Sequence, residues 1–142
     1  MEALNNNPLE KRFIVAGLIL LSAGFLFGLT GALQYVVPGF LKQVFSFERT
    51  RPLHVSSIVF WILLCSMGAV FVYLQQYKGK KIFSPLLVKI QLGLFVIDIL
   101  LILMSYCFGM FGGREYWEFN PLLAIPIVAG WLLFGYNFLR SV

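Results

Sequence analysis

Four long apolar runs, separated by short polar segments, constrain this sequence more than any other feature. A membrane-spanning helix needs about 20 predominantly apolar residues, and the runs at about 13–37, 54–77, 85–108 and 121–139 are of that order. Lipid offers the backbone no hydrogen-bond partners, so each run should be an α-helix. The sequence therefore predicts an all-α integral membrane four-helix bundle, with residues 1–142 forming a single transmembrane domain.

Composition agrees with this class, because 60% of the residues are hydrophobic and only 12% are charged, outside the range of ordinary soluble domains. The net charge of +5 comes from loop lysines and arginines at membrane surfaces, which favours membrane lipid as a partner and gives no reason to expect nucleic acid. The first run is too long for the apolar part of a signal peptide, and no cleavage site follows it. Cys65 and Cys107 fall at different depths, so we expect small, buried, unpaired thiols.

Basic residues predict the orientation of the bundle. Four spans place the N-terminus, the 78–81 segment and the C-terminus on one side of the membrane. That side carries six basic residues and the opposite side four, namely Lys11, Arg12, Lys78, Lys80, Lys81 and Arg140 against Lys42, Arg49, Arg51 and Arg114. The positive-inside rule then places both termini in the cytoplasm.

The entrance to the second run holds the strongest candidate site. Arg51 and His54, the sole histidine of the chain, flank Pro52 there. Proline suits the first turn of a helix, so we expect His54 to lie one turn or less inside the membrane boundary. An imidazole there can ligate a haem iron, while a guanidinium one turn nearer the water can bind haem propionates. The alternative without a ligand is that His54 is a half-solvated residue at the membrane interface.

Two helical faces are rich in small residues. On the first span they are Gly17, Gly24, Gly28 and Gly31. On the second span the face of His54 continues through Ser57, Trp61, Cys65 and Gly68. Small residues let membrane helices approach closely. We therefore expect the first face to pack on a helix and the second to meet protein or a cofactor.

Three carboxylates are further candidates. Asp98 lies near mid-membrane, where an ionisable group is costly and is often functional; the alternative is a protonated side chain hydrogen-bonded to a neighbouring helix. Glu115 and Glu118 lie together in the loop after the third span and can bind a hard cation, or can be solvated loop charges. The sequence contains no second histidine, Cys-x-x-Cys-His motif, phosphate loop or nucleophile–base pair, so no catalytic residue is predicted.

Several segments resemble a known family. Arg-Pro-Leu-His-Val-Ser-Ser-Ile-Val-Phe at 51–60 resembles the start of the second helix in subunit I of the haem–copper oxidase superfamily. Leu-Gln-Tyr-Val-Val-Pro at 33–38 resembles the end of its first helix. Gly-Arg-Glu-Tyr-Trp-Glu at 113–118, followed by a helix that starts with proline, is similar to a loop of nitric oxide reductases, of which cbb-type cytochrome oxidases carry a looser version. The resemblance covers nearly the whole chain.

The resemblance implies the first four helices of a fold of about twelve. His54 would be one axial ligand of the low-spin haem b, Arg51 would pair with its propionates, Glu115 would bind a calcium ion, and Glu118 would belong to an outer proton-entry or propionate network. It further implies a bacterial inner (cytoplasmic) membrane, the remaining helices of subunit I as partners, and a cytochrome c-type subunit or quinol as electron donor.

The departure from the family is large, because its other haem and metal ligands come from later helices and His54 is the sole histidine here. We therefore expect an N-terminal portion of a respiratory reductase that supplies one haem ligand for electron transfer. Reduction of nitric oxide or dioxygen would need the complete subunit. Two alternatives remain open: a non-enzymatic protein whose homodimer shares a haem between two copies of His54, and a small transporter built around Asp98.

Overall fold

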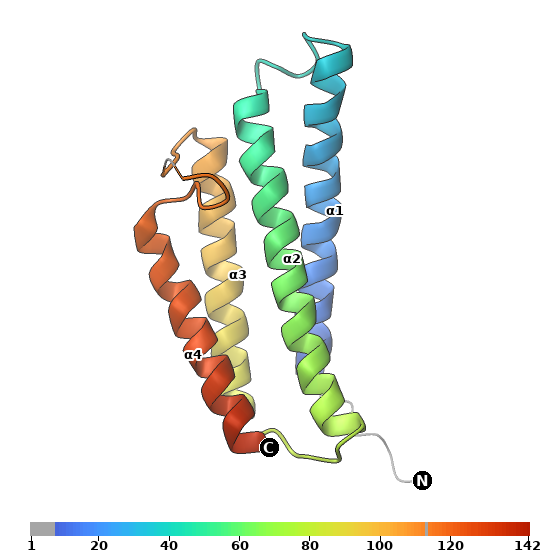
Figure 1. The fold of residues 1–142 in the computed structure, drawn as a ribbon, viewed down its shortest axis with the longest axis vertical. Helices are drawn as coiled ribbons and strands as arrows, with labels where there is room; N and C mark the ends of the chain where they lie inside the picture. Colours follow the sequence, from blue (N-terminus) through green and yellow to red (C-terminus); the bar gives the residue numbers. More distant parts are fainter. Residues whose placement is uncertain (1–7, 113) are drawn as a thin grey trace.

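A computed structural model of the chain describes residues 8–112 and 114–142. Its four long helices, drawn in Figure 1, are α1 (Pro8–Val36), α2 (Phe47–Gln76), α3 (Pro85–Cys107) and α4 (Ala124–Ser141). A 3₁₀ helix, Pro121–Leu123, leads into α4. The helical segments are long and apolar enough to cross a membrane four times. The predicted all-α class with four spans is confirmed, and the chain is a multi-pass membrane protein.

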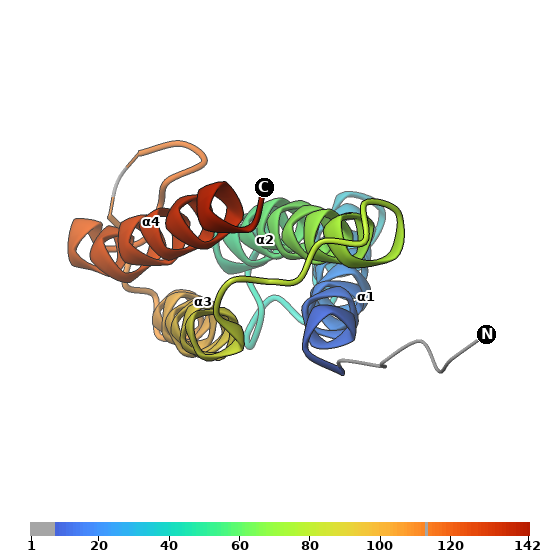
Figure 2. The same ribbon diagram turned by 90° about the horizontal axis from the view of Figure 1, so that it is seen from below.

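The helices run alternately up and down, so the bundle has two distinct ends (Figure 1). We call the end with the α1–α2 and α3–α4 connections the loop end. The other end, the terminal end, holds the α2–α3 connection, the start of α1 and the end of α4. Figure 2 shows that the helices form two pairs: α1 packs on α2 and α3 on α4, while the interface between α2 and α3 is smaller.

Glycines set the close approach of α1 to α2. A Cβ atom added at Gly17 would lie 2.5 Å from Cys65 Sγ, and one at Gly28 would lie 2.7 Å from His54 Nδ1. Carbon atoms do not approach other heavy atoms so closely in packed interiors, so neither position has room for a side chain. The predicted packing role of the α1 glycines is confirmed. The small-residue face of α2 meets protein, because it is the surface that these glycines contact.

Polar groups join the helices at the terminal end. Asn137, fully buried in α4, accepts a hydrogen bond from the backbone N–H of Ser84 (3.0 Å) and donates one to the Ser84 carbonyl (3.1 Å). In the other pair, Gln75 of α2 donates to the buried carboxylate of Glu10 in α1. Each helix pair therefore has a polar contact that fixes its register at this end.

The start of α2 differs from the prediction. The helix begins at Phe47, before the expected start at about His54, and Pro52 lies inside it. The prediction that Pro52 occupies the first turn was wrong, because helical structure continues beyond the apolar run into a polar segment. Glu48 in the first turn favours this extension through the helix dipole. Proline here removes one backbone hydrogen bond, near a helix end where water can replace it.

The two cysteines are both free thiols. Cys65 is half-buried against Gly17, in agreement with the expected packing role. Cys107 is exposed, so the expectation that it is buried was wrong. It is the last residue of α3, and the chain leaves the bundle at that point.

Candidate functional site

The ring of His54 is fixed between α2 and α1. Its Nδ1 atom lies 2.7 Å from the backbone carbonyl oxygen of Gly24. A carbonyl oxygen can only accept a hydrogen bond, so Nδ1 carries the proton. In the neutral ring, Nε2 then keeps its lone pair, the form in which histidine ligates a metal. Gly28 allows this approach, because a side chain there would occupy the space of the imidazole.

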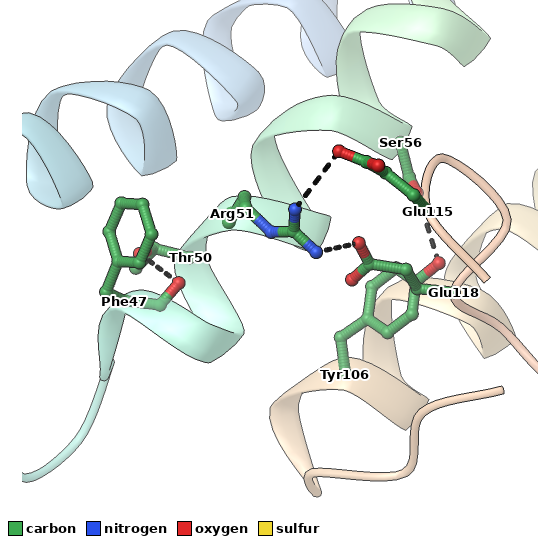
Figure 3. A network of polar contacts seen from close by, with 7 residues as sticks. All are labelled: Phe47, Thr50, Arg51, Ser56, Tyr106, Glu115 and Glu118. Atoms are coloured by element: carbon green, nitrogen blue, oxygen red, sulfur yellow. Dashed lines mark hydrogen bonds and ion pairs between the residues drawn. The ribbon is translucent and has the colours of Figure 1, made fainter. Parts of the chain in front are cut away.

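Arg51 lies three residues before His54, one turn nearer the loop end. Its guanidinium donates to the Glu118 carboxylate and lies 3.7 Å from a carboxylate oxygen of Glu115 (Figure 3). The Glu115 side chain is 68% exposed and that of Glu118 is 14% exposed, so only the second is held inside the structure. The structure therefore brings three of the four predicted site residues into one cluster, with His54 the next turn along the same helix.

The loop between α3 and α4 holds these carboxylates beside Arg51 of α2. A tight turn joins Arg114 to Trp117, whose N–H donates to the Arg114 carbonyl (3.0 Å). Tyr116 within this turn has a φ of 63°, a left-handed conformation. Trp117 stacks on Phe119 with ring centroids 5.4 Å apart, which stiffens the segment on either side of Glu118. Gly113, part of the segment that resembles the reductase loop, lies outside the described residues.

Sequence reasoning missed a buried polar pair next to this cluster. The hydroxyl of Tyr106, near the end of α3, lies 3.2 Å from Ser56 Oγ of α2, and Tyr106 is fully buried. Figure 3 draws Tyr106 behind Glu118, and the phenol lies within electrostatic range of that carboxylate. The available signal was a tyrosine in the last turn of an apolar run, which also fits a residue at the membrane surface.

An open cavity of about 660 Å³ lies at the loop end beside the cluster. Its walls carry two guanidinium groups and three carboxylates in addition to two aromatic rings, contributed by Phe47, Glu48, Arg51, Phe111, Arg114, Glu115 and Glu118. Groups of both charges can bind acidic ligand groups and a cation together. Within residues 8–112 and 114–142, no three His, Cys, Asp or Glu side chains are placed to hold a metal ion. A calcium ion here would need oxygen ligands beyond these carboxylates, such as backbone carbonyls or water.

Asp98 lies apart from this cluster, near the middle of α3. It is 2% exposed, and neither carboxylate oxygen has a hydrogen-bond partner among the described residues. The described helices therefore do not make the hydrogen bond that was the alternative interpretation of this side chain. The side chain points into the bundle, but the helices packed around it offer it no donor.

Comparison with known proteins identifies the family of the chain. The model of the family described as "Cytochrome C and Quinol oxidase polypeptide I" matches residues 9–142. The chain belongs to this family. The predicted membership of the haem–copper oxidase subunit I family is thus confirmed. Proteins of the cytochrome c and quinol oxidase family bind haems and assemble with other oxidase parts.

A curated relative is similar to this protein over most of the chain. It is a nitric oxide reductase subunit of Stutzerimonas stutzeri, and it is 30% identical over 146 residues, which cover 93% of this chain and 31% of that protein. The chain therefore spans less than a third of the length of this relative. The similarity agrees with the resemblance of the 113–118 loop to nitric oxide reductases.

Proposed function

We propose that this chain supplies one axial ligand of a low-spin haem b, His54, to a respiratory reductase of the subunit I type. The observation that carries the proposal is the hydrogen bond from Nδ1 to the Gly24 carbonyl. It fixes both the tautomer and the plane of the ring and leaves the lone pair of Nε2 for a ligand, which supports a role in binding iron. A haem bound there would pass single electrons, at a potential set by its ligands and surroundings.

Arg51 and the loop carboxylates complete the binding site in this proposal. The guanidinium already binds carboxylates, and haem propionates present the same chemical group. Arg51 would therefore exchange one carboxylate partner for another when the propionates arrive. Glu115 is exposed enough to turn towards a calcium ion beside the propionates, and Glu118, which is less exposed, would belong to the outer proton-entry or propionate network.

The remaining parts of the reductase would come from elsewhere in a larger protein. The relative's greater length supports this view, because this chain covers 31% of it. The other haem ligands and the metal site would lie on further helices, and electrons would arrive from a cytochrome c-type subunit or quinol. The name of the relative favours nitric oxide over dioxygen as the substrate. We place the assembly in a bacterial inner membrane, with both termini of this chain in the cytoplasm.

The test is a haem spectrum recorded after co-expression with the complementary helices. We expect a bis-histidine haem b signal that His54→Ala abolishes, because the alanine variant loses the iron ligand. Gly135→Ala is the matched control, since an added methyl there meets no atom within 4 Å. An unchanged spectrum in His54→Ala would reject the assignment. Haem bound by this chain alone, at one haem per two chains, would favour the shared-haem homodimer.

A further inference from the structure

Asp98 is the polar group in the bundle that its surroundings satisfy least. It is 2% exposed, and both of its carboxylate oxygens lack a partner among residues 8–112 and 114–142. An ionised carboxylate buried without a donor or cation is strongly unfavourable, and in a membrane helix the penalty applies along the whole span. The carboxylate therefore needs a hydrogen-bond donor, a cation or a proton, and the described side chains provide neither a donor nor a cation.

The burial of Asp98 restricts what that companion can be. Another helix, a lipid headgroup or an organic ligand cannot reach a side chain that is almost fully covered without displacing its neighbours. A proton can, and a neutral carboxylic acid needs no countercharge. We propose that Asp98 is held as a neutral acid inside the bundle and forms a site that binds and releases one proton within the membrane. This inference does not depend on haem binding.

Further buried polar side chains lie in register with Asp98 on α3. Gln91 and Ser105, seven residues away on either side, are 1% and 8% exposed. Seven residues are nearly two helical turns, so the three groups follow one face of α3 at intervals of about 10 Å. Gln91 donates to the sulfur of Met67, and Ser105 donates to the Ile102 carbonyl of its own helix.

Polar groups continue from Ser105 to the loop end. Its neighbour Tyr106 shares a hydrogen bond with Ser56, and either oxygen of that pair can be the donor. Figure 3 shows the pair next to the Glu118 carboxylate, which is itself bound to Arg51. Because either hydroxyl can donate, the pair can take up a proton on one side and release one on the other. The loop end is therefore the side from which we expect Asp98 to exchange its proton.

Infrared spectroscopy of the reconstituted chain tests the first part of the proposal. Asp98 is the sole aspartate of the sequence. Cell-free synthesis with aspartate that carries ¹³C at its side-chain carboxyl group therefore labels this acid without any mutation. We expect a carbonyl band of a protonated acid at neutral pH that shifts with the label. The same band should vanish in Asp98→Asn and persist in Glu115→Gln, an exposed carboxylate. A labelled band at the carboxylate position instead would overturn the proposal.

Exchange into deuterated water tests release of the proton and the route. We expect the labelled band to shift as the acid takes up deuterium, and to do so several-fold more slowly in Tyr106→Phe, which lacks the phenolic hydroxyl. Gln91→Met, on the terminal side of Asp98, should exchange at the rate of the unchanged chain. A band that never shifts would show a permanently sealed acid and refute release. Slower exchange in Gln91→Met than in Tyr106→Phe would refute the loop-end route.

Discussion

The two helix pairs of this bundle differ in how much close glycine packing and polar contacts contribute to them. Contact between α1 and α2 depends on missing atoms, since glycines of α1 lie where side chains would strike α2. Contact between α3 and α4 at the terminal end depends on atoms that are present, because the amide of Asn137 fills two hydrogen bonds of the Ser84 backbone. An added methyl at these α1 glycines should therefore damage the first pair, and loss of the Asn137 amide should damage the second. The second pair also contains one glycine contact, since a Cβ atom at Gly130 of α4 would lie 2.7 Å from the Phe95 ring of α3.

The sharpest test of this difference adds one methyl group to the first pair. Gly28→Ala should lower the free energy of unfolding by about 1–3 kcal/mol, because the new carbon overlaps the His54 ring and forces a shift. Unfolding in detergent measures the loss, and ¹⁵N NMR of the imidazole reports whether Nδ1 still donates to Gly24. Gly93→Ala is the control, because its methyl meets no atom within 4 Å. Equal stability of both variants would contradict the role of missing atoms.

The second test removes polar atoms from the other pair. Asn137→Leu should lower the free energy of unfolding by about 1 kcal/mol, because both backbone groups of Ser84 lose their partner while some water access softens the effect. The measurement is again unfolding in detergent. Gln76→Leu removes an exposed amide at the same end and should have no effect. A stable Asn137→Leu variant would show that apolar packing alone joins α3 and α4.

The smallest effect is expected where an exposed ion pair joins the two pairs of helices. Arg51→Gln breaks the contacts with Glu115 and Glu118, yet it should change the free energy of unfolding by less than about 1 kcal/mol, because water screens charges at the surface. The residual difference should shrink at high salt. Lys42→Gln provides a matched loss of charge at the loop end. A large, salt-independent loss would make Arg51 a structural residue and weaken its assignment to propionates.

The sequence predicted the spans and a helix-packing role for the glycines of the first span, because apolar length and glycine spacing are local signals. It did not predict that these glycines meet His54. It did not predict where α2 begins, since the polar segment before His54 can be helical as well as coiled. The link between Arg51 and Glu118 joins residues far apart in the chain, and only the fold brings them together. The pair Ser56–Tyr106 was missed for the same reason.

Asn137 and Asp98 show a further limit. Each is one polar residue within an apolar run. Asp98 was singled out from the sequence because it is ionisable, and Asn137 was not. The fold gives Asn137 two backbone partners and leaves Asp98 without any among the described residues. Residue type alone does not distinguish these outcomes, because the available partners depend on which helix faces the side chain and at what depth.

The acceptor that orients His54 belongs to the main chain and not to a side chain. Any amino acid at position 24 carries the same carbonyl, and an added methyl there would lie 2.9 Å from Cδ1 of Ile58 and 3.1 Å from Cβ of Ser57. At position 28 the obstacle is the imidazole itself. A substitution at position 24 keeps the carbonyl acceptor, whereas a substitution at position 28 displaces the imidazole. Related sequences that keep the histidine should therefore vary more at position 24 than at position 28.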